Sequence, residues 1–387
     1  MSRLFTLLAT SVPLSALPAL AQSSPLEYES SLEAVTVVSL GHDTDRVTDT
    51  EEILYEISLD NRIEKVLSNG LQVSGRLTLR GQRDHPLRPG FAGNFGDAAG
   101  PVGAYSGLSG NAAGDQTGAR GSLEAAYLEL DGGYGEVRIG RDRGVASRFH
   151  EGAPSALSHA RIDSPYLDPN GLKIIRTSHD LTGPSAKISY ATPRILGLRA
   201  AASYTPDADA RGLDRDVSGL NGQPDLENAF ELAANLSRRL RSPDVRIDAS
   251  LGWSTAEVGS LIGAPRGSVD TWSAGTQLEF PLLTLGGSWM SSDNGFQGGD
   301  YTAWEIGAGF DWAETEFSLN YGEAEDDLAV LSSEAISLAA ARDLTDSLRL
   351  AVAYQDEALM TASGNRTGAG FVVEITLSSD FLAITTN

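Results

Sequence analysis

Cysteine is absent from this chain of 387 residues, which excludes a disulfide framework and thiolate metal sites. Positive charge is scarce, because 29 Lys and Arg residues stand against 52 Asp and Glu residues and the formal net charge is −23. A protein that binds nucleic acid must neutralise phosphates, so this charge balance disfavours that function. Long apolar runs are also missing beyond residue 21, where no segment offers the roughly 20 apolar residues of a transmembrane helix.

The one long apolar stretch lies at the N-terminus and has the form of a secretory signal peptide. Arg3 gives the positive start, residues 4–17 are mostly apolar, and Ala19-Leu20-Ala21 is a small-x-small cleavage site. A membrane anchor is the alternative, although Pro13 and Pro18 interrupt the run and it is short for a spanning helix. We therefore expect a signal peptide over residues 1–21 and one mature domain over residues 22–387.

Most of the remaining sequence repeats one pattern, in which apolar and polar residues alternate over a short stretch and a break follows. Residues 245–253 are the clearest example, with Val, Ile, Ala, Leu and Trp at odd positions and Arg, Asp, Ser and Gly at even positions. This alternation is typical of strands with two different faces. We expect about sixteen strands, an even number as in bacterial outer-membrane barrels, near residues 31–41, 52–60, 70–80, 121–131, 135–142, 185–192, 197–205, 229–240, 244–257, 269–280, 282–291, 301–312, 315–323, 331–342, 346–357 and 368–378.

Short and long breaks alternate along the chain. The short ones include 131–134, 192–196, 241–243, 281 and 344–345, and the long ones include 81–120, 143–184, 206–228, 258–268 and 358–367. A closed antiparallel barrel predicts this asymmetry, with short periplasmic turns on one side and long outer loops on the other. One connection does not fit, because residues 61–69 are long where a turn is needed.

The two registers of the strands differ in character. The apolar register contains all five tryptophans near strand ends, where amphipathic rings lie at the membrane interfaces, namely Trp253, Trp272, Trp289, Trp304 and Trp312. The other register is rich in Ser, Gly, Asn, Glu and Arg. We therefore expect an all-β transmembrane antiparallel β-barrel, in which Val352 faces lipid and Ala353 faces a water-filled lumen. A soluble β-sandwich or β-solenoid is the alternative.

One turn and the segment after it stand apart from this pattern. Gly133-Tyr134-Gly135 predicts a tight turn, because glycine takes a positive φ angle without steric cost. A strand follows, and from Arg143 to about Pro184 the alternation disappears. A gap of this length is typical of a functional or disordered loop rather than a hairpin connection. We expect this loop to fold into a larger unit.

The residues around this loop resemble a known family. Residues 127–141 are similar to the strand, glycine turn and strand that precede the third loop of Gram-negative general (diffusion) porins. Residues 187–198 resemble the Tyr-x-x-Pro-x-x-x-Gly turn that follows that loop. The resemblance implies an outer-membrane channel for passive diffusion of ions and small hydrophilic solutes, with the third loop folded into the pore. It also implies a homotrimer, contacts with outer-membrane lipid and lipopolysaccharide, and insertion by the barrel-assembly machinery.

The C-terminus departs from that family, whose members end on an aromatic residue recognised during assembly. This chain instead ends Phe381-Leu382-Ala383-Ile384-Thr385-Thr386-Asn387. Phe381 follows Leu377 by two-residue steps in the apolar register. We expect an internal assembly signal at Phe381 with a short tail after it.

Charge at a narrow constriction sets the selectivity of such a channel. The arginines of the third and fifth strands share the polar register, and the third loop carries several carboxylates. The alternative is that these are ordinary solvated charges. The expected basic wall and the acidic group that faces it are Arg76, Arg80 and Arg138 on the strands and Glu151, Asp163 and Asp168 on the loop.

Three other functions are considered for this sequence. A solute-specific channel for a sugar or an anion needs an aromatic slide along the lumen, and the aromatics here fall mainly in the outward register. An outer-membrane hydrolase can use a histidine as a base, but no nucleophile-elbow pattern accompanies His42, His85, His150, His159 or His179, so we expect no enzyme. Oxygen-rich loops can hold Ca²⁺, although a solvated acidic surface is the simpler reading of residues such as Glu325, Asp326 and Asp327, and we expect no cofactor.

Overall fold

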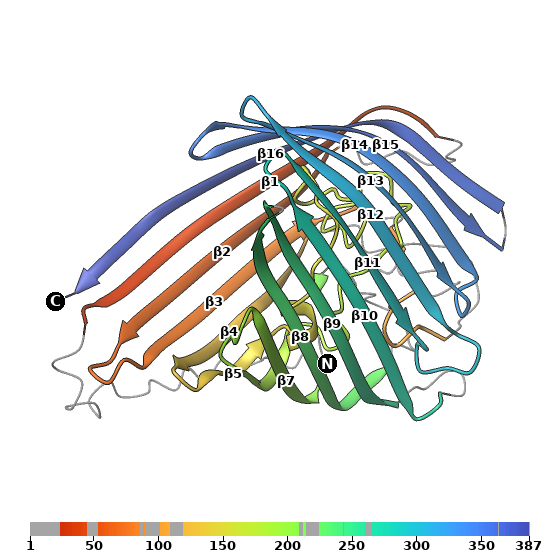
Figure 1. Cartoon of the computed structure of the whole chain (residues 1–387). Helices are drawn as coiled ribbons and strands as arrows, with labels where there is room; N and C mark the ends of the chain where they lie inside the picture. Colours follow the sequence, from red (N-terminus) through yellow and green to blue (C-terminus); the bar gives the residue numbers. More distant parts are fainter. Residues whose placement is uncertain are drawn as a thin grey trace, which may run out of the picture.

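The computed structural model describes residues 24–44, 53–85, 88–89, 101–108, 119–208, 212–213, 224–242, 244–259, 265–362 and 364–386. The expected signal peptide lies outside these residues. Sixteen strands form one closed antiparallel barrel, in which each strand pairs with its neighbours in sequence and β1 pairs with β16 (Figure 1). The all-β barrel expected from the alternating pattern is confirmed.

The strands have the following bounds: β1 Leu26–Thr44, β2 Ile53–Val66, β3 Gln72–Arg83, β4 Arg120–Gly132, β5 Gly135–Asp142, β6 Ser185–Ala191, β7 Leu198–Asp207, β8 Asp225–Arg241, β9 Asp244–Gly259, β10 Ser268–Glu279, β11 Leu283–Ser292, β12 Tyr301–Trp312, β13 Thr315–Asp326, β14 Leu331–Thr345, β15 Leu348–Thr361 and β16 Gly364–Thr386. One short helix, α1 (Val145–Arg148), follows β5. Within these ranges no helix is long and apolar enough to cross a membrane.

Three expectations at the strand ends are corrected. The connection that did not fit is a turn over 67–71, because β2 continues to Val66. The predicted tail after Phe381 is wrong, since β16 runs to Thr386 and pairs there with the start of β1. The long loop expected over 358–367 is a two-residue connection, because β15 ends at Thr361 and β16 begins at Gly364. In each case the backbone pairing of neighbouring strands extends beyond the alternating segment.

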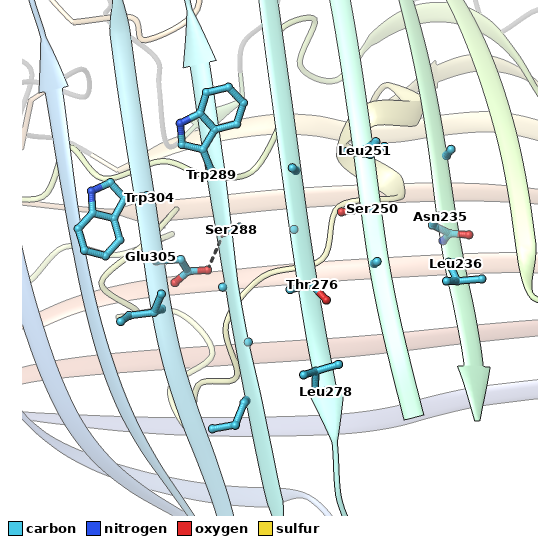
Figure 2. A pocket seen from close by; sticks show the side chains of 18 of the residues that line it. Asn235, Leu236, Ser250, Leu251, Thr276, Leu278, Ser288, Trp289, Trp304 and Glu305 are labelled. Atoms are coloured by element: carbon cyan, nitrogen blue, oxygen red, sulfur yellow. Dashed lines mark hydrogen bonds between the residues drawn. The ribbon is translucent and has the colours of Figure 1, made fainter. Parts of the chain in front are cut away.

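The two faces of the wall follow the two registers. Trp253 lies opposite Trp272, and Trp289 lies opposite Trp304, so that four tryptophans form a row across β9 to β12. Figure 2 shows this part of the wall, where Glu305, next to Trp304 in sequence, accepts a hydrogen bond from Ser288 at 3.0 Å. Outward aromatic rings therefore alternate with inward polar groups, as the sequence predicts.

The glycine turn between β4 and β5 has the predicted backbone. Gly135 has a φ angle of +115°, and a Cβ atom there would lie 2.3 Å from the carbonyl oxygen of Ala191. Only glycine fits this position. The turn places Glu129 of β4 directly opposite Arg138 of β5, and it leads the chain into the loop that fills part of the barrel.

Candidate functional site

The third loop, residues 143–184, starts where β5 ends and is held to the wall at both of its ends by Glu231 of β8. The Glu231 carboxylate accepts the backbone N–H of Ala146 at 3.3 Å and the hydroxyl of Thr182 at 2.7 Å. Ala146 belongs to α1, which packs on β7, β8 and β9. One carboxylate therefore fixes the beginning and the end of the loop to the same strand.

Between these ends the loop lies inside the barrel and follows its wall (Figure 1). Inward side chains of three strands accept its backbone N–H groups: Ser250 of β9 from Glu151 at 2.9 Å, Glu305 of β12 from Ala153 at 2.8 Å, and Ser318 of β13 from Ala156 at 2.9 Å. A buried backbone N–H without a partner costs about as much as a lost hydrogen bond. The polar register of the strands thus serves to hold an irregular loop.

Toward the outer ends of several strands the inward register is apolar, unlike the polar lining expected from the sequence. Val258 of β9 and Met290 of β11 are buried there in one cluster with Ile174 and Leu181 of the third loop. Tyr105, from the segment 101–108, belongs to the same cluster, and its hydroxyl donates to the carbonyl of Ser178 at 2.8 Å. The loop is therefore packed as a folded unit with its own apolar contacts.

Arg80 is the predicted wall residue that contacts the third loop. Its guanidinium carbon lies 4.9 Å from the ring centroid of Tyr166, a residue of the loop. Its side chain is only 6% exposed and lies near two carboxylates, at 3.8 Å from Glu56 and 3.6 Å from Glu124. Arg80 therefore connects β2, β4 and the loop in a position that water hardly reaches.

Arg76 and Arg138, the other two predicted wall residues, line one cavity on the periplasmic side of Arg80. Arg76 donates to Asp60 at 2.8 Å and its side chain is 47% exposed. Arg138 forms ion pairs with Glu129 at 2.5 Å and with Asp142 at 3.0 Å. The structure thus brings these two arginines together and places Arg80 further out.

Among the predicted loop acids, Asp163 has partners inside the loop, and Glu151 lies near a carboxylate of β9, which does not carry the predicted basic wall. Asp163 accepts hydrogen bonds from Arg161 at 2.8 Å and from Thr177 at 3.1 Å. Burial alone would raise the pKa of Asp163, but the charge of Arg161 lowers this pKa below its ordinary value. Glu151 is half-buried near Asp248 of β9, and burial followed by that like charge raises the pKa of Glu151.

Asp168 is fully buried and accepts the backbone N–H groups of Asn170 at 3.1 Å and Lys173 at 2.9 Å. Burial opposes its ionisation, yet the charge of Lys173 lowers its pKa. These contacts give Asp163 and Asp168 roles in holding the loop together. A direct opposition of the three loop acids and the three arginines across a constriction remains a prediction.

The strand register already places Glu136 inward beside Arg138, but it does not reveal the other ionic partners of these residues. Glu136 accepts hydrogen bonds from Arg148 of α1 and, at 2.8 Å, from Arg199 of β7, and it lies 2.8 Å from Arg138. The signal for one such pair was available, because the glycine turn sets Glu129 opposite Arg138. Arg148 and Arg199 reach Glu136 only because the loop and β7 fold beside β5.

His179 and His150 lack the features of an accessible catalytic base. Both ring nitrogens of His179 contact serine hydroxyls, at 2.8 Å from Ser273 and 2.6 Å from Ser254, and the side chain is fully buried. Burial lowers the pKa of His150 to about 4, which leaves it neutral at pH 7. Among the residues whose structure is described, no group of three or more His, Asp or Glu side chains could hold a metal ion.

Comparison with known proteins gives a family and a fold. Residues 6–358 match the sequence model of Gram-negative porins. The chain is also 24% identical over 140 residues to an uncharacterised protein of Rickettsia felis, and it spans 31% of the length of that curated relative.

Solved structures share the barrel at low sequence identity. OprB of Pseudomonas putida, in its high-pH structure, has a TM-score of 0.58 and 10% identity, with 92% of this chain and 94% of that chain covered. The trimer form of OmpT from Vibrio cholerae has a TM-score of 0.56 and 9% identity, covering 92% and 99%. The anion-selective porin from Comamonas acidovorans has a TM-score of 0.53 and 17% identity, covering 92% and 100%. These likenesses concern the fold alone.

Proposed function

Because this chain belongs to the Gram-negative porin family, we propose that its lumen carries ions and small hydrophilic solutes by passive diffusion across the outer membrane of a Gram-negative bacterium. The family and the closed barrel establish the coarser statement, which is an outer-membrane channel for the diffusion of solutes. Such proteins are typically channels rather than enzymes.

The observation that carries the proposal is the exposure of charged side chains on the inner wall. Arg76 of β3 and Arg246 of β9 are 47% and 51% exposed, although both lie in the inward register of a closed wall. Charges that stay in contact with water on both sides of the lumen are expected for an aqueous channel rather than a filled core.

We place the constriction where the third loop meets the basic wall. The contact between Arg80 and Tyr166 supports this position. Arg80 and the loop acids Glu151, Asp163 and Asp168 would act there on passing ions, and Arg76 and Arg138 would extend the basic wall along the path. With a formal charge of −23 on the chain, we expect a weak preference for cations.

Single-channel recording of the purified protein in planar bilayers tests this function. We expect stepwise insertion with a stable conductance in potassium chloride, and a reversal potential in a salt gradient that indicates weak cation selectivity. The absence of any conductance step from correctly folded protein would contradict the proposal.

The assembly that we propose is a homotrimer inserted by the barrel-assembly machinery and surrounded by lipid and lipopolysaccharide. OmpT, which shares the fold, is described in a trimer form, and the family resemblance points the same way. Light scattering in mild detergent should give three times the mass of the mature chain. A monomeric mass for the full-length protein would contradict the proposed homotrimer.

A further inference from the structure

A cavity of about 360 Å³ lies in the inner wall on the periplasmic side of the third loop. Its lining comes from β16 and from β1 to β5. Arg76, which lines it, precedes Arg80 by four residues on β3, a distance of ~13 Å along a strand. The cavity is thus separate from the contact between Arg80 and the loop, and its size is within the range of small-molecule sites.

The strand register sets two arginines side by side in this cavity. Arg62 of β2 lies directly opposite Arg76 of β3, and like charges at such positions destabilise a sheet. The two side chains are 48% and 47% exposed. Among the described residues each forms one ion pair, Arg62 with Glu64 at 2.7 Å and Arg76 with Asp60 at 2.8 Å. A guanidinium has five N–H donors, so both groups keep donors for a carboxylate that enters the cavity.

Two further carboxylates of the lining, Glu29 and Asp380, are exposed. Glu29 of β1 lies directly opposite Arg62, and Asp380 of β16 lies opposite Ser31 of β1. Neither Glu29 nor Asp380 forms an ion pair with another residue in the part of the chain that the structure describes. The cavity also contains Arg138, paired with Glu129, and Asp60, paired with Arg76. Beside these pairs it presents two exposed guanidinium groups and two exposed carboxylates.

We propose that this cavity binds small amino-acid zwitterions as they pass through the channel. Arg62 and Arg76 hold the carboxylate by charge-assisted hydrogen bonds, for which the planar guanidinium is suited. Glu29 and Asp380 hold the ammonium group. This inference rests on the proposed channel function and deepens it by naming a class of solute and a place on its path.

A matched series of solutes tests the pairing of charges. L-alanine carries both charges, N-acetyl-L-alanine only the carboxylate, and L-alaninamide only the ammonium group. Each is added to one side and then the other of a planar bilayer that contains the full-length protein, and the dissociation constant is taken from the current noise. We expect L-alanine to bind about tenfold more tightly than either single-charge analogue, because each lost partner removes a charge-assisted hydrogen bond.

Variants of the cavity link this binding to its residues. Arg62→Gln and Arg76→Gln should each weaken the binding of L-alanine about tenfold and leave the binding of L-alaninamide unchanged. The double variant Glu29→Gln, Asp380→Asn should also weaken the binding of L-alanine, but it should leave the binding of N-acetyl-L-alanine unchanged. Arg246→Gln is the matched control, because this arginine is 51% exposed in the lumen, 2.9 Å from Asp248, but lies on β9 across the barrel. Equal affinities for L-alanine and N-acetyl-L-alanine, or equal effects of Arg62→Gln and Arg246→Gln, would overturn the proposal.

The outcome separates this inference from the channel function. Normal conductance in potassium chloride with no effect of L-alanine would contradict the binding site and leave the channel intact. If no conductance is found, equilibrium dialysis of radiolabelled L-alanine against the protein in detergent still tests the site. Specific binding that Arg62→Gln weakens about tenfold would support the site, and the absence of specific binding would overturn it.

Discussion

The carboxylate of Glu374 accepts the backbone N–H of His159 at 2.9 Å, although 215 residues separate the two in sequence. Ser158 and Ala160 donate their backbone N–H groups to the same carboxylate, also at 2.9 Å. Hydrogen bonds to an ionised acceptor are stronger than neutral ones. A side chain of the last strand therefore fixes the middle of the third loop.

Glu374→Gln should loosen this attachment. The amide has one oxygen and presents an N–H₂ group to donors that need an acceptor, so we expect a loss of about 1–3 kcal/mol in the free energy of unfolding and larger fluctuations of the single-channel current. Glu279→Gln, at a 53% exposed inward position on β10, is the control. Similar noise and similar melting curves for the two variants would contradict the role of Glu374.

The attachment of the loop to β2 should depend on pH through His159. Burial favours its neutral form, but the hydrogen bond and charge of Glu56, with further contributions from Glu374 and Glu33, raise the pKa of His159. Because its pKa is raised in the folded state, His159 stabilises the folded protein fully at pH values below the unfolded-state pKa of 6.5. This stabilisation is lost as the pH rises through the folded-state pKa.

Melting curves measured between about pH 5 and about pH 9 test this dependence. We expect the parent protein to lose stability over this range relative to His159→Gln, which cannot be protonated. Parallel curves for the two proteins would show that His159 does not titrate against Glu56.

The register of β15 can be tested with a charge. Val352 is 40% exposed on the outer face, and an arginine there should cost about 2–4 kcal/mol near the middle of the membrane. The sequence suggests Ala353 as the tolerant partner, but Ala353 is 1% exposed and is buried with Leu157 of the third loop. Gln277→Arg, in the inward register of β10, is the suitable control. Equal destabilisation in both variants would contradict the register.

Arg80 should contribute to the stability of the fold as well as to ion selectivity. Replacing it by Gln leaves Glu56 and Glu124 near each other with little access to water, and breaking a buried ion pair typically costs about 3–5 kcal/mol. Denaturant or thermal unfolding of Arg80→Gln measures this loss. Adding Glu56→Gln to the variant should recover part of it, whereas additive losses would argue against the pairing.

The strands could be predicted from the sequence because each of them has two unlike environments. Alternation of apolar and polar residues encodes lipid on one side and the lumen on the other, and the positive φ angle required at Gly135 marks the turn. The ends of β1 and β16 could not be found this way, since pairing there continues through residues with weaker alternation.

The contacts inside the third loop could not be predicted from the alternation of apolar and polar residues. The acidity of Asp163 and Asp168 and their place in the loop predict a role in the pore. Their environment depends on Arg161 and Lys173, which the irregular backbone folds beside them. No periodicity encodes such contacts. Arg76, Arg80 and Arg138 lie in the inward register, because they belong to strands whose register the sequence specifies.

The contacts of residues 158–160 also depend on the strands that close the barrel. They take their acceptor from β16, while His159 lies 3.5 Å from Glu56 of β2, so the loop spans both sides of β1. The full set of contacts of residues 158–160 therefore exists only when β1 is paired with both β16 and β2. The position of the middle of the third loop thus depends on the seam at which the two ends of the sheet meet.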